Sequence, residues 1–474
     1  MNKRTAGLFI FLIWCGSSFS QQAATYTLQQ CVDAALKNNL VVQQAELQAK
    51  RDEINFKQAK YDMLPDLNGS VYHGINRGRS IDPFSNSYID QQITTANYGL
   101  NSGVVLFNGF SMQNAVKQNK LAFDASKMDW QQQKDNITIN VILAYLQVLS
   151  SEDALTQMSN QAALSKQQVD RLEILNREGA IPPSQLSDLK GEYAGNQLGI
   201  INTESTVQLA KMSLCQLMNM PYSKTMMVER IETGSLANKY EDAPDKIYET
   251  SLKQFAQIKA TDLRVASAEK GVKVAKGQLF PTLSFGLNAN TNYSSAATQD
   301  VFTGNALVST SDYVTVSGTQ YNVTRQVSNF TSSKVGYGNQ LKNFLFTSYG
   351  LNLRIPVFNA FRQRNKIRLA ELSLKNSQAV ASTAKTQLQQ AIEQAYINMT
   401  SASDRYKTLL QQAEAFKESF KAAESRFTNG VGTTTDYLIA KNNLDRTNIN
   451  IINARYDFLL RTKVLDYYQG KQLW

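Results

Sequence analysis

The sequence has a single histidine, His73, and only three cysteines among its 474 residues. Transition-metal sites in proteins are built mainly from His, Cys and carboxylate ligands at short, fixed spacings. No set of these residues has such a spacing here, and no motif marks a serine or carboxylate as a nucleophile. The sequence therefore predicts no metal site, no cofactor and no enzymatic activity, and His73 is interpreted as a pore or loop side chain.

Long hydrophobic runs are also absent. Beyond the N-terminus no stretch approaches the ~18 to 20 apolar residues that a membrane-spanning helix requires, and the mean hydropathy is −0.34. The net charge of +10 comes from Lys and Arg scattered among acidic and amide residues, without a basic cluster or interleaved aromatics. This pattern argues against nucleic-acid binding. If the chain crosses a membrane, it does so as a β-barrel.

Residues 1–20 have the pattern of a signal peptide. Lys3 and Arg4 precede an apolar stretch at 8–14, and the small residues Ser18 and Ser20 suit cleavage before Gln21. A lipoprotein anchor at Cys15 is the alternative, but Trp14 occupies the preceding position, where a small residue is needed. The sequence predicts export from the cytoplasm.

Proline and glycine are both missing between Leu388 and Phe427, where apolar residues keep an alternating spacing of four and three. Such a heptad pattern predicts a helix that packs with left-handed supercoiling against its neighbours. The residues of this seam are Leu388, Ile392, Ala395, Met399, Ala402, Tyr406, Leu409, Ala413, Phe416, Phe420, Ala423 and Phe427. The predicted helix, 361–428, is about 100 Å long at the usual rise per residue.

The chain contains a tandem duplication. The Tyr-Gly-Leu-Asn motif at 98–101 recurs at 349–352, and Leu-Phe-Asn-Gly-Phe at 106–110 recurs as Val-Phe-Asn-Ala-Phe at 357–361. The same shift places Gly179 on Gly430 and carries the heptad seam onto an upstream helix, 110–177. The repeating unit therefore contains one very long helix.

Period-two alternation predicts two strands in each copy. In the first copy a helix at 27–62 ends before Pro65, and apolar and polar residues then alternate in a hairpin over 66–107. In the second copy a helix at 247–279 precedes Pro281 and a hairpin over 282–358. Its arms are separated by a polar surface loop, 294–343, which has room for extra β-structure. Arms of about ten residues suit tilted transmembrane strands.

These patterns predict a division into repeats. The predicted segments are a signal peptide at 1–20, a first repeat at 21–220, a link at 221–245 and a second repeat at 246–474. Each repeat ends with a return helix, at 184–218 and at 434–468. Ser184 is expected to cap the first of these helices. Thr433 and Asp436 have the spacing of a capping box.

Four membrane strands cannot close a barrel, which needs at least about eight. The chain must therefore oligomerise. Two copies would give eight strands and a filled interior, whereas three would give twelve and the beginning of a lumen. The expected product is mainly α with transmembrane β, a tube of long helices capped by a β-pore.

The chain resembles the TolC-type outer-membrane efflux family. The resemblance rests on the duplication, the Leu-Pro and Phe-Pro helix ends at 64–65 and 280–281, the two repeated motifs, and the turn at 426–430 with Asp436. It implies a homotrimer with a twelve-stranded barrel in the outer membrane of a Gram-negative bacterium, in contact with its lipid, and a twelve-helix periplasmic α-barrel. A periplasmic adaptor and an inner-membrane pump of the RND or ABC type are the implied partners.

The resemblance also places functional residues at the two periplasmic turns, 178–185 and 429–436. The residues expected to dock the adaptor at this tip are Gly179, Ala180, Ile181, Gln185, Phe427, Gly430, Val431, Gly432 and Asp436. Asp436 matches a carboxylate of the family's acidic ring, which would favour cations; alternatively, it only stabilises a helix N-terminus. The family's gating links need an aspartate at Gln185 and an arginine at Gly432, and this chain has neither.

Cys31 and Cys215 remain after signal-peptide removal, and both are expected at mid-height of the tube. Either a disulfide or two unpaired buried thiols fits an oxidising periplasm.

Two functions remain open. The first is a passive exit duct of a tripartite efflux pump or type I secretion system. The alternative is a structural or adhesive coiled-coil protein without a channel, in which the alternating segments form ordinary hairpins.

Overall fold

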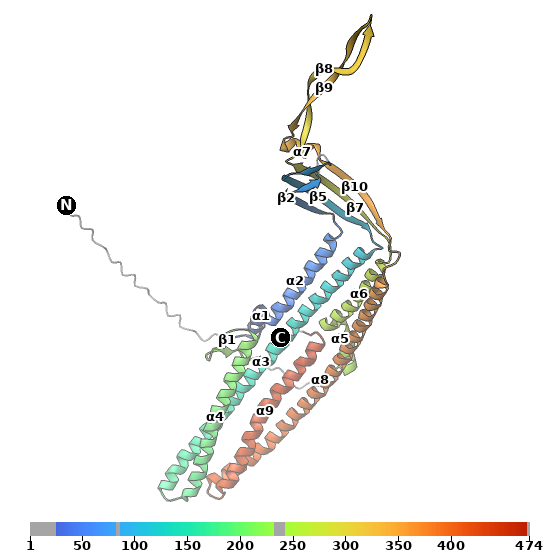
Figure 1. Ribbon diagram of the computed structural model, residues 1–474. Coiled ribbons are helices and arrows are strands. Elements are labelled where there is room, and N and C mark those ends of the chain that lie inside the picture. Colours follow the sequence, from blue (N-terminus) through green and yellow to red (C-terminus); the bar gives the residue numbers. More distant parts are fainter. Residues whose placement is uncertain (1–24, 82–85, 232–241, 472–474) are drawn as a thin grey trace, which may run out of the picture. The chain divides into compact units, whose positions relative to one another are not determined.

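The computed structural model describes residues 25–81, 86–231 and 242–471 (Figure 1). The predicted signal peptide and the middle of the predicted link lie outside the described residues. The helices are α1 (Leu28–Asn38), α2 (Leu40–Tyr61), α3 (Ser111–Arg177), α4 (Pro183–Leu217), α5 (Pro244–Gln254), α6 (Ala256–Gly277), α7 (Tyr337–Asn343), α8 (Arg362–Thr428) and α9 (Thr434–Tyr468). Within the described residues, no helix combines the length and the hydropathy required to cross a bilayer.

The strands differ widely in length, from two residues in β1 and β6 to 19 residues in β8. They are β1 (Thr25–Tyr26), β2 (Asp66–Asn76), β3 (Arg79–Ile81), β4 (Tyr88–Asp90), β5 (Ile93–Phe107), β6 (Met227–Val228), β7 (Thr282–Ser294), β8 (Thr298–Val316), β9 (Thr319–Lys334) and β10 (Phe346–Arg354). The chain divides into two compact units. One comprises the described residues of Met1–Arg51, Phe123–Arg264 and Gln378–Trp474, and the other those of Asp52–Ala122 and Val265–Ser377.

The first unit is helical, and its core repeats the sequence duplication. Helices α3 and α8 are each 67 residues long. One buried cluster gathers around α1, α3 and α4, and a second around α5, α6, α8 and α9. Residues of the heptad seam and their upstream counterparts lie in these clusters: Ile137, Val141 and Val148 in the first, and Leu388, Ile392 and Met399 in the second. The seam is therefore the buried side of both long helices.

Two helices that the sequence predicts as continuous are broken in the structure. The predicted helix 27–62 is interrupted at Asn39, whose ψ is 125°, and the predicted helix 247–279 at Phe255, whose ψ is 122°. The Asn39 side chain accepts a hydrogen bond from the Val41 N–H at 2.9 Å and donates one to the Leu217 carbonyl at 3.0 Å. The Phe255 ring packs edge-on against Tyr467 at 5.5 Å. Contacts with residues far along the chain thus stabilise both breaks. The local pattern of apolar residues therefore does not predict where the breaks occur.

The second unit contains an antiparallel sheet in the order β10-β7-β5-β2. β2 pairs with β5 from Asp66 to Asn76, and β7 pairs with β10 from Thr282 to Asn290. β5 pairs with β7, so one sheet combines the hairpins of both repeats (Figure 1). The predicted loop 294–343 contains a second antiparallel pair, β8 and β9, followed by α7.

Cys31 and Cys215 are free thiols in the first buried cluster. The Cys215 Sγ lies 3.4 Å from the Met226 Sδ. Of the two alternatives that the sequence leaves open, the structure has the unpaired thiols. Burial, with a smaller effect from nearby Cys215, raises the pKa of Cys31 to about 12. Burial also raises the pKa of Cys215.

Alkylation of the folded protein tests this environment. A thiol reacts as its thiolate, and at pH 8 a pKa near 12 leaves almost none at Cys31. We expect iodoacetamide to label Cys31 and Cys215 at least ~100-fold more slowly in the folded protein than in urea, as measured by mass spectrometry. The fold favours the neutral thiol of Cys31. Its contribution to the free energy of unfolding is therefore fully present below the pKa of the unfolded chain and declines as the pH rises towards 12. Fast labelling, or an intact mass showing a disulfide, would contradict the assignment.

Candidate functional site

One face of the four-stranded sheet carries a row of amide and hydroxyl side chains. Asn68 is the register partner of Asn101, Asn101 of Asn288, and Asn288 of Ser348. Partners in register project to the same side of a sheet. The row therefore crosses all four strands and gives this face a continuous polar surface.

The opposite face is apolar. The neighbouring register row contains Leu67, Ser102, Leu287 and Tyr349. Leu67 is 67% exposed and Tyr349 is 80% exposed, although both are large side chains. A water-soluble sheet usually buries its apolar face against a core. Helix α7 contacts this face at Tyr98 and Thr291. Around Leu67 and Tyr349 no other described residue covers it, as expected for a surface that contacts lipid or another protein.

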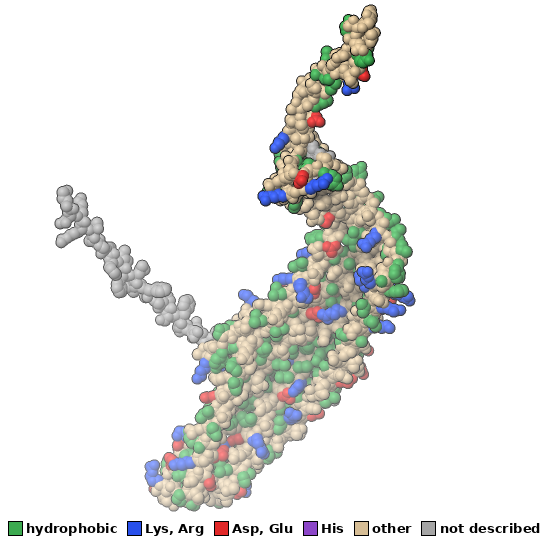
Figure 2. All heavy atoms as spheres, in the orientation of Figure 1, with side chains coloured by type: hydrophobic (Ala, Val, Ile, Leu, Met, Phe, Trp, Pro, Cys, Tyr) green, Lys and Arg blue, Asp and Glu red, His purple; other side chains and the backbone are tan. Residues whose placement is uncertain are grey.

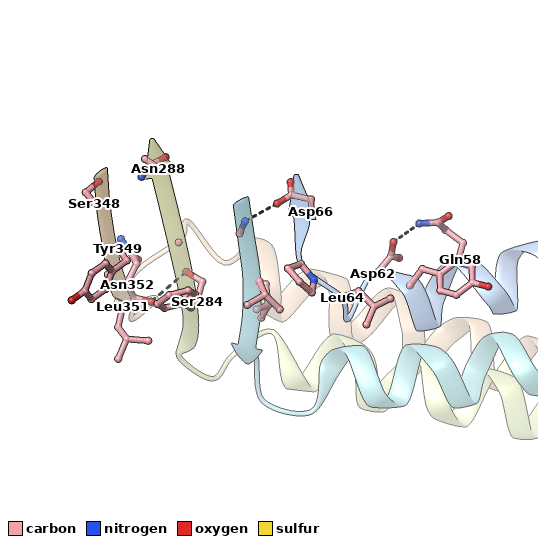
Figure 3. Close-up of a pocket in the computed structure, with 18 residues that line it drawn as sticks. Gln58, Asp62, Leu64, Asp66, Ser284, Asn288, Ser348, Tyr349, Leu351 and Asn352 are labelled. Atoms are coloured by element: carbon pink, nitrogen blue, oxygen red, sulfur yellow. Dashed lines mark hydrogen bonds between the residues drawn. The ribbon is translucent and has the colours of Figure 1, made fainter. Parts of the chain in front are cut away.

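The polar face is hollowed where it meets the end of α2. The hollow has a volume of about 890 Å³, and its lining includes Asp62, Asp66, Ser284, Asn288 and Asn352 (Figure 3). Asp62 accepts a hydrogen bond from the Gln58 side chain at 2.6 Å. Asp66 accepts one from the Gly103 N–H at 2.7 Å and another from Asn68 at 2.9 Å. The hollow is thus a concavity in which both carboxylates already accept hydrogen bonds.

Both outer strands of this sheet have an open edge. β2 pairs only with β5, and β10 pairs only with β7, among the residues that the structure describes. The unpaired N–H and C=O groups of an edge strand bind water or another strand. In a hydrocarbon layer the first option is lost, so both edges would require strands from other chains.

The second candidate region is the tip of the first unit, where α3 turns into α4 and α8 turns into α9 (Figure 1). Gly179 has φ +73° and Gly430 has φ +77°, a backbone region that favours glycine. Both glycines end their helix in the same way, because the following residue, Ala180 or Val431, donates its N–H to a carbonyl five residues earlier. The two turns are therefore structural copies.

The starts of the two return helices differ. α4 begins at Pro183 and its N-cap is Pro182, without a side-chain cap, so the prediction that Ser184 caps this helix is wrong. Proline is well suited to the first helical position because it has no N–H to leave unsatisfied. α9 has Thr433 as its N-cap, and the Thr433 hydroxyl accepts the Asp436 N–H at 3.1 Å.

The predicted tip residues separate into exposed and packed groups. Gly179, Ala180, Gly430, Val431 and Asp436 are exposed, whereas Ile181, Gln185, Phe427 and Gly432 are partly buried. Phe427 stacks on Tyr437 at 4.8 Å between ring centroids. A side chain at Gly432 would bring its Cβ within 3.1 Å of the Arg426 backbone. An arginine at this position would therefore crowd the turn.

The residues that hold the two turns together have no signal of their own in the sequence. Tyr437 is 2% exposed and shares a buried cluster with Leu172 on α3 and Leu189 on α4. Burial raises the pKa of Tyr437 to about 12. The Arg171 guanidinium also donates to the Thr428 carbonyl at 3.1 Å. The heptad pattern of α8 predicted that its apolar side is buried. It did not show which helices would pack against Tyr437.

A buried ion cluster lies further along α9. The Lys441 ammonium is 2.6 Å from Asp445 and 3.3 Å from Glu192 on α4, and its side chain is only 3% exposed. Burial raises the pKa of Asp445 despite the opposing effect of Lys441. This cluster joins the two helical hairpins by charge as well as by packing.

Comparison with known proteins decides the family. The model of the family described as outer membrane efflux protein matches residues 31–220 and 247–468, which together form most of the chain. The chain belongs to this family. Its two matched segments fall on the two copies of the duplication and leave the region between them unmatched.

The relatives of this efflux protein cover nearly its whole length. It is 21% identical to the outer membrane efflux protein BepC of Brucella suis over 94% of this chain and 85% of that protein. It is 20% identical to the outer membrane protein TolC of Escherichia coli over 94% of this chain and 82% of that protein. Family membership places the protein in the outer membrane with a periplasmic extension, and makes it a conduit rather than an enzyme.

Solved structures share the fold. The transmembrane channel CusC superposes with a TM-score of 0.76 at 14% identity, covering 96% of both chains. The outer membrane protein VceC of Vibrio cholerae superposes with a TM-score of 0.73 at 14% identity, covering 94% of this chain and 97% of that one. The predicted combination of long helices and an antiparallel sheet is thus the fold of this channel family.

Neighbouring residues of β7 offer a direct test of the two sheet faces. Leu287 lies on the apolar face and Asn288 on the polar face. A lysine facing lipid near the middle of a bilayer costs about 2 to 4 kcal/mol, whereas a lysine facing water costs little. We expect Leu287→Lys to reduce strongly the amount of assembled protein in outer membranes, and Asn288→Lys to leave it near normal. Equal losses in the two variants would show that the faces are assigned wrongly.

A second test concerns the Lys441 cluster. Lys441→Met leaves Glu192 and Asp445 without their buried cation, and we expect the free energy of unfolding to fall by about 3 kcal/mol. Lys417→Met is the control, because Lys417 is 67% exposed and lies 3.8 Å from Glu414. It should change stability by less than about 0.5 kcal/mol. Denaturant unfolding followed by circular dichroism measures the stability of both variants. Similar losses of stability in the two variants would show that the buried Lys441 contributes no more than an exposed lysine.

Proposed function

We propose that three copies of this chain form the outer-membrane exit duct of a tripartite efflux or secretion system. Substrates pass from an inner-membrane pump and its periplasmic adaptor through the duct to the exterior. Each repeat, 21–220 and 246–474, contributes two strands to the pore and two long helical segments to the periplasmic wall. The duct conducts passively, and its cargo is selected by the pump.

The observation that carries this proposal is the open sheet with one polar and one apolar face. A closed barrel needs at least about eight strands, and this chain supplies four. Three copies give twelve strands, enough to leave a lumen instead of a filled interior. The Asn and Ser row would then line water, and Leu67, Leu287 and Tyr349 would face lipid.

The tip supports the second half of the proposal. Its exposed residues, Gly179, Ala180, Gly430, Val431 and Asp436, lie on two structurally similar turns. We assign these turns to adaptor docking, since an α-helical hairpin of an adaptor could pack into the grooves between them. Three copies of Asp436 would add a negative potential at the periplasmic aperture.

Oligomeric mass and conductance test the proposal together. The purified protein in detergent should have about three times the mass of one processed chain, which is 52.9 kDa before the predicted signal peptide is removed. Closed assemblies should conduct ions across a planar bilayer. A boiled sample should migrate as a monomer. A monomeric particle in detergent, or a trimer that never conducts, would contradict the proposal.

A further inference from the structure

The β8–β9 hairpin extends beyond the four-stranded sheet and pairs with nothing else among the described residues. Its register runs from Thr298 opposite Lys334 to Val316 opposite Thr319. At its base, the Val335 N–H donates to the Ala297 carbonyl at 3.1 Å. An isolated two-stranded hairpin is at best marginally stable in water. A hairpin of this length therefore gains stability from any surface that covers it.

One face of the hairpin is apolar along most of its length. Register pairs on this face include Ala306 with Val327, Val314 with Tyr321, and Val308 with Arg325, which is the charged side chain of the face. The apolar members of this valine face are Val301, Ala306, Val308, Val314, Tyr321, Val323 and Val327. Val301 is 43% exposed, Val308 49% and Val314 53%. β-branched side chains of this kind normally pack on a neighbouring surface. Nothing in the described part of the chain covers them.

The opposite face is of another kind. Its register pairs are Phe302 with Phe330, Asn305 with Ser328, Leu307 with Gln326, Ser309 with Thr324 and Tyr313 with Asn322. Hydroxyl and amide side chains predominate, and the two phenylalanine rings contact each other at 5.8 Å. Exposed apolar side chains also occur on this face, at Phe302, Leu307, Tyr313 and Phe330, but polar pairs separate them. The valine face is therefore the more continuous apolar surface of the hairpin.

The charges on the hairpin indicate the partner. Between residues 298 and 334 the charged side chains are Asp300, Asp312, Arg325 and Lys334, which sum to zero. Figure 2 shows few blue or red side chains along this hairpin. A surface made for phosphate groups would be rich in Lys and Arg, and edge strands that must stay apart usually carry charges, especially Lys. The hairpin has neither feature, so identical copies can approach without net repulsion.

Chain connectivity brings such copies together. β7 leads into β8 through three residues, and β9 returns through α7 to β10. Any assembly that closes the open edges of β2 and β10 with other copies therefore holds one hairpin per copy at the same rim of the sheet. The high local concentration favours contact between them. Asp312 and Arg325 make no side-chain ion pair within the described residues, and they can pair between copies.

We propose that the valine faces of the β8–β9 hairpins from neighbouring copies pack against one another. The partner of this surface is a further copy of the same chain. The proposal rests on the trimeric duct proposed above and adds a second site of association at the outer end of the pore. There the hairpins form a self-covered bundle with their polar faces outward.

Cysteine cross-linking at adjacent positions tests the packing. Val308 lies on the valine face, whereas Leu307 lies on the opposite face and is 75% exposed. Single variants Val308→Cys and Leu307→Cys are expressed in outer membranes and oxidised with copper phenanthroline. We expect at least ten times more disulfide-linked dimer for Val308→Cys in non-reducing gels. The parent chain, with Cys31 and Cys215 buried, sets the background.

The oligomeric mass of each variant separates the two proposals. If the variants are trimers and Val308→Cys links no better than Leu307→Cys, the hairpin packing is wrong and the duct stands. If both are monomers, the duct proposal fails and the packing fails with it. Cross-links that are lost when trimers are diluted before oxidation would show contact between particles, and would also overturn the packing within one trimer.

Discussion

Backbone hydrogen bonding at the edges of the four-stranded sheet is the constraint on which the rest of the structure depends. β2 and β10 each leave one row of N–H and C=O groups unpaired in a single chain. In water such edges are tolerated, but in hydrocarbon every unpaired group costs several kcal/mol. The trimeric duct that we propose would satisfy these groups, because strands of other copies would pair with both edges. The strand number, the two-sided character of the sheet and the duplication all meet this requirement.

The long helices meet a different constraint. A helix of 67 residues is not stable in water by itself along its whole length. Its apolar seam must be buried against neighbouring helices. Around the middle of α3 and α8 the chain provides those neighbours in two related clusters. Towards the tip, burial narrows to Tyr437 and the few residues around it, with the Lys441 cluster beside them. The tip thus depends on a small number of contacts.

The sequence patterns of this chain predict some features of the sheet and the tip, but not others. Alternation in β2, β5, β7 and β10 predicted the polar and apolar faces, because a strand has only two sides. The pairing of β5 with β7, which joins the two repeats into one sheet, has no local signal. At the tip, Gly179 and Gly430 marked the turns, since few other residues adopt a positive φ. The prediction that Ser184 caps α4 was wrong, because Pro182 is the N-cap and the helix already begins at Pro183.

The sequence by itself determined the duplication, the length of the two longest helices and the strand faces, because these follow from the period of the apolar residues. Only the tertiary structure decided the breaks at Asn39 and Phe255, the free state of Cys31 and Cys215, and the partners of Tyr437 and Lys441. Each of these depends on which residues, far apart along the chain, come within a few ångströms. Local patterns carry no information about such distances, since packing between helices is established only when the whole unit folds.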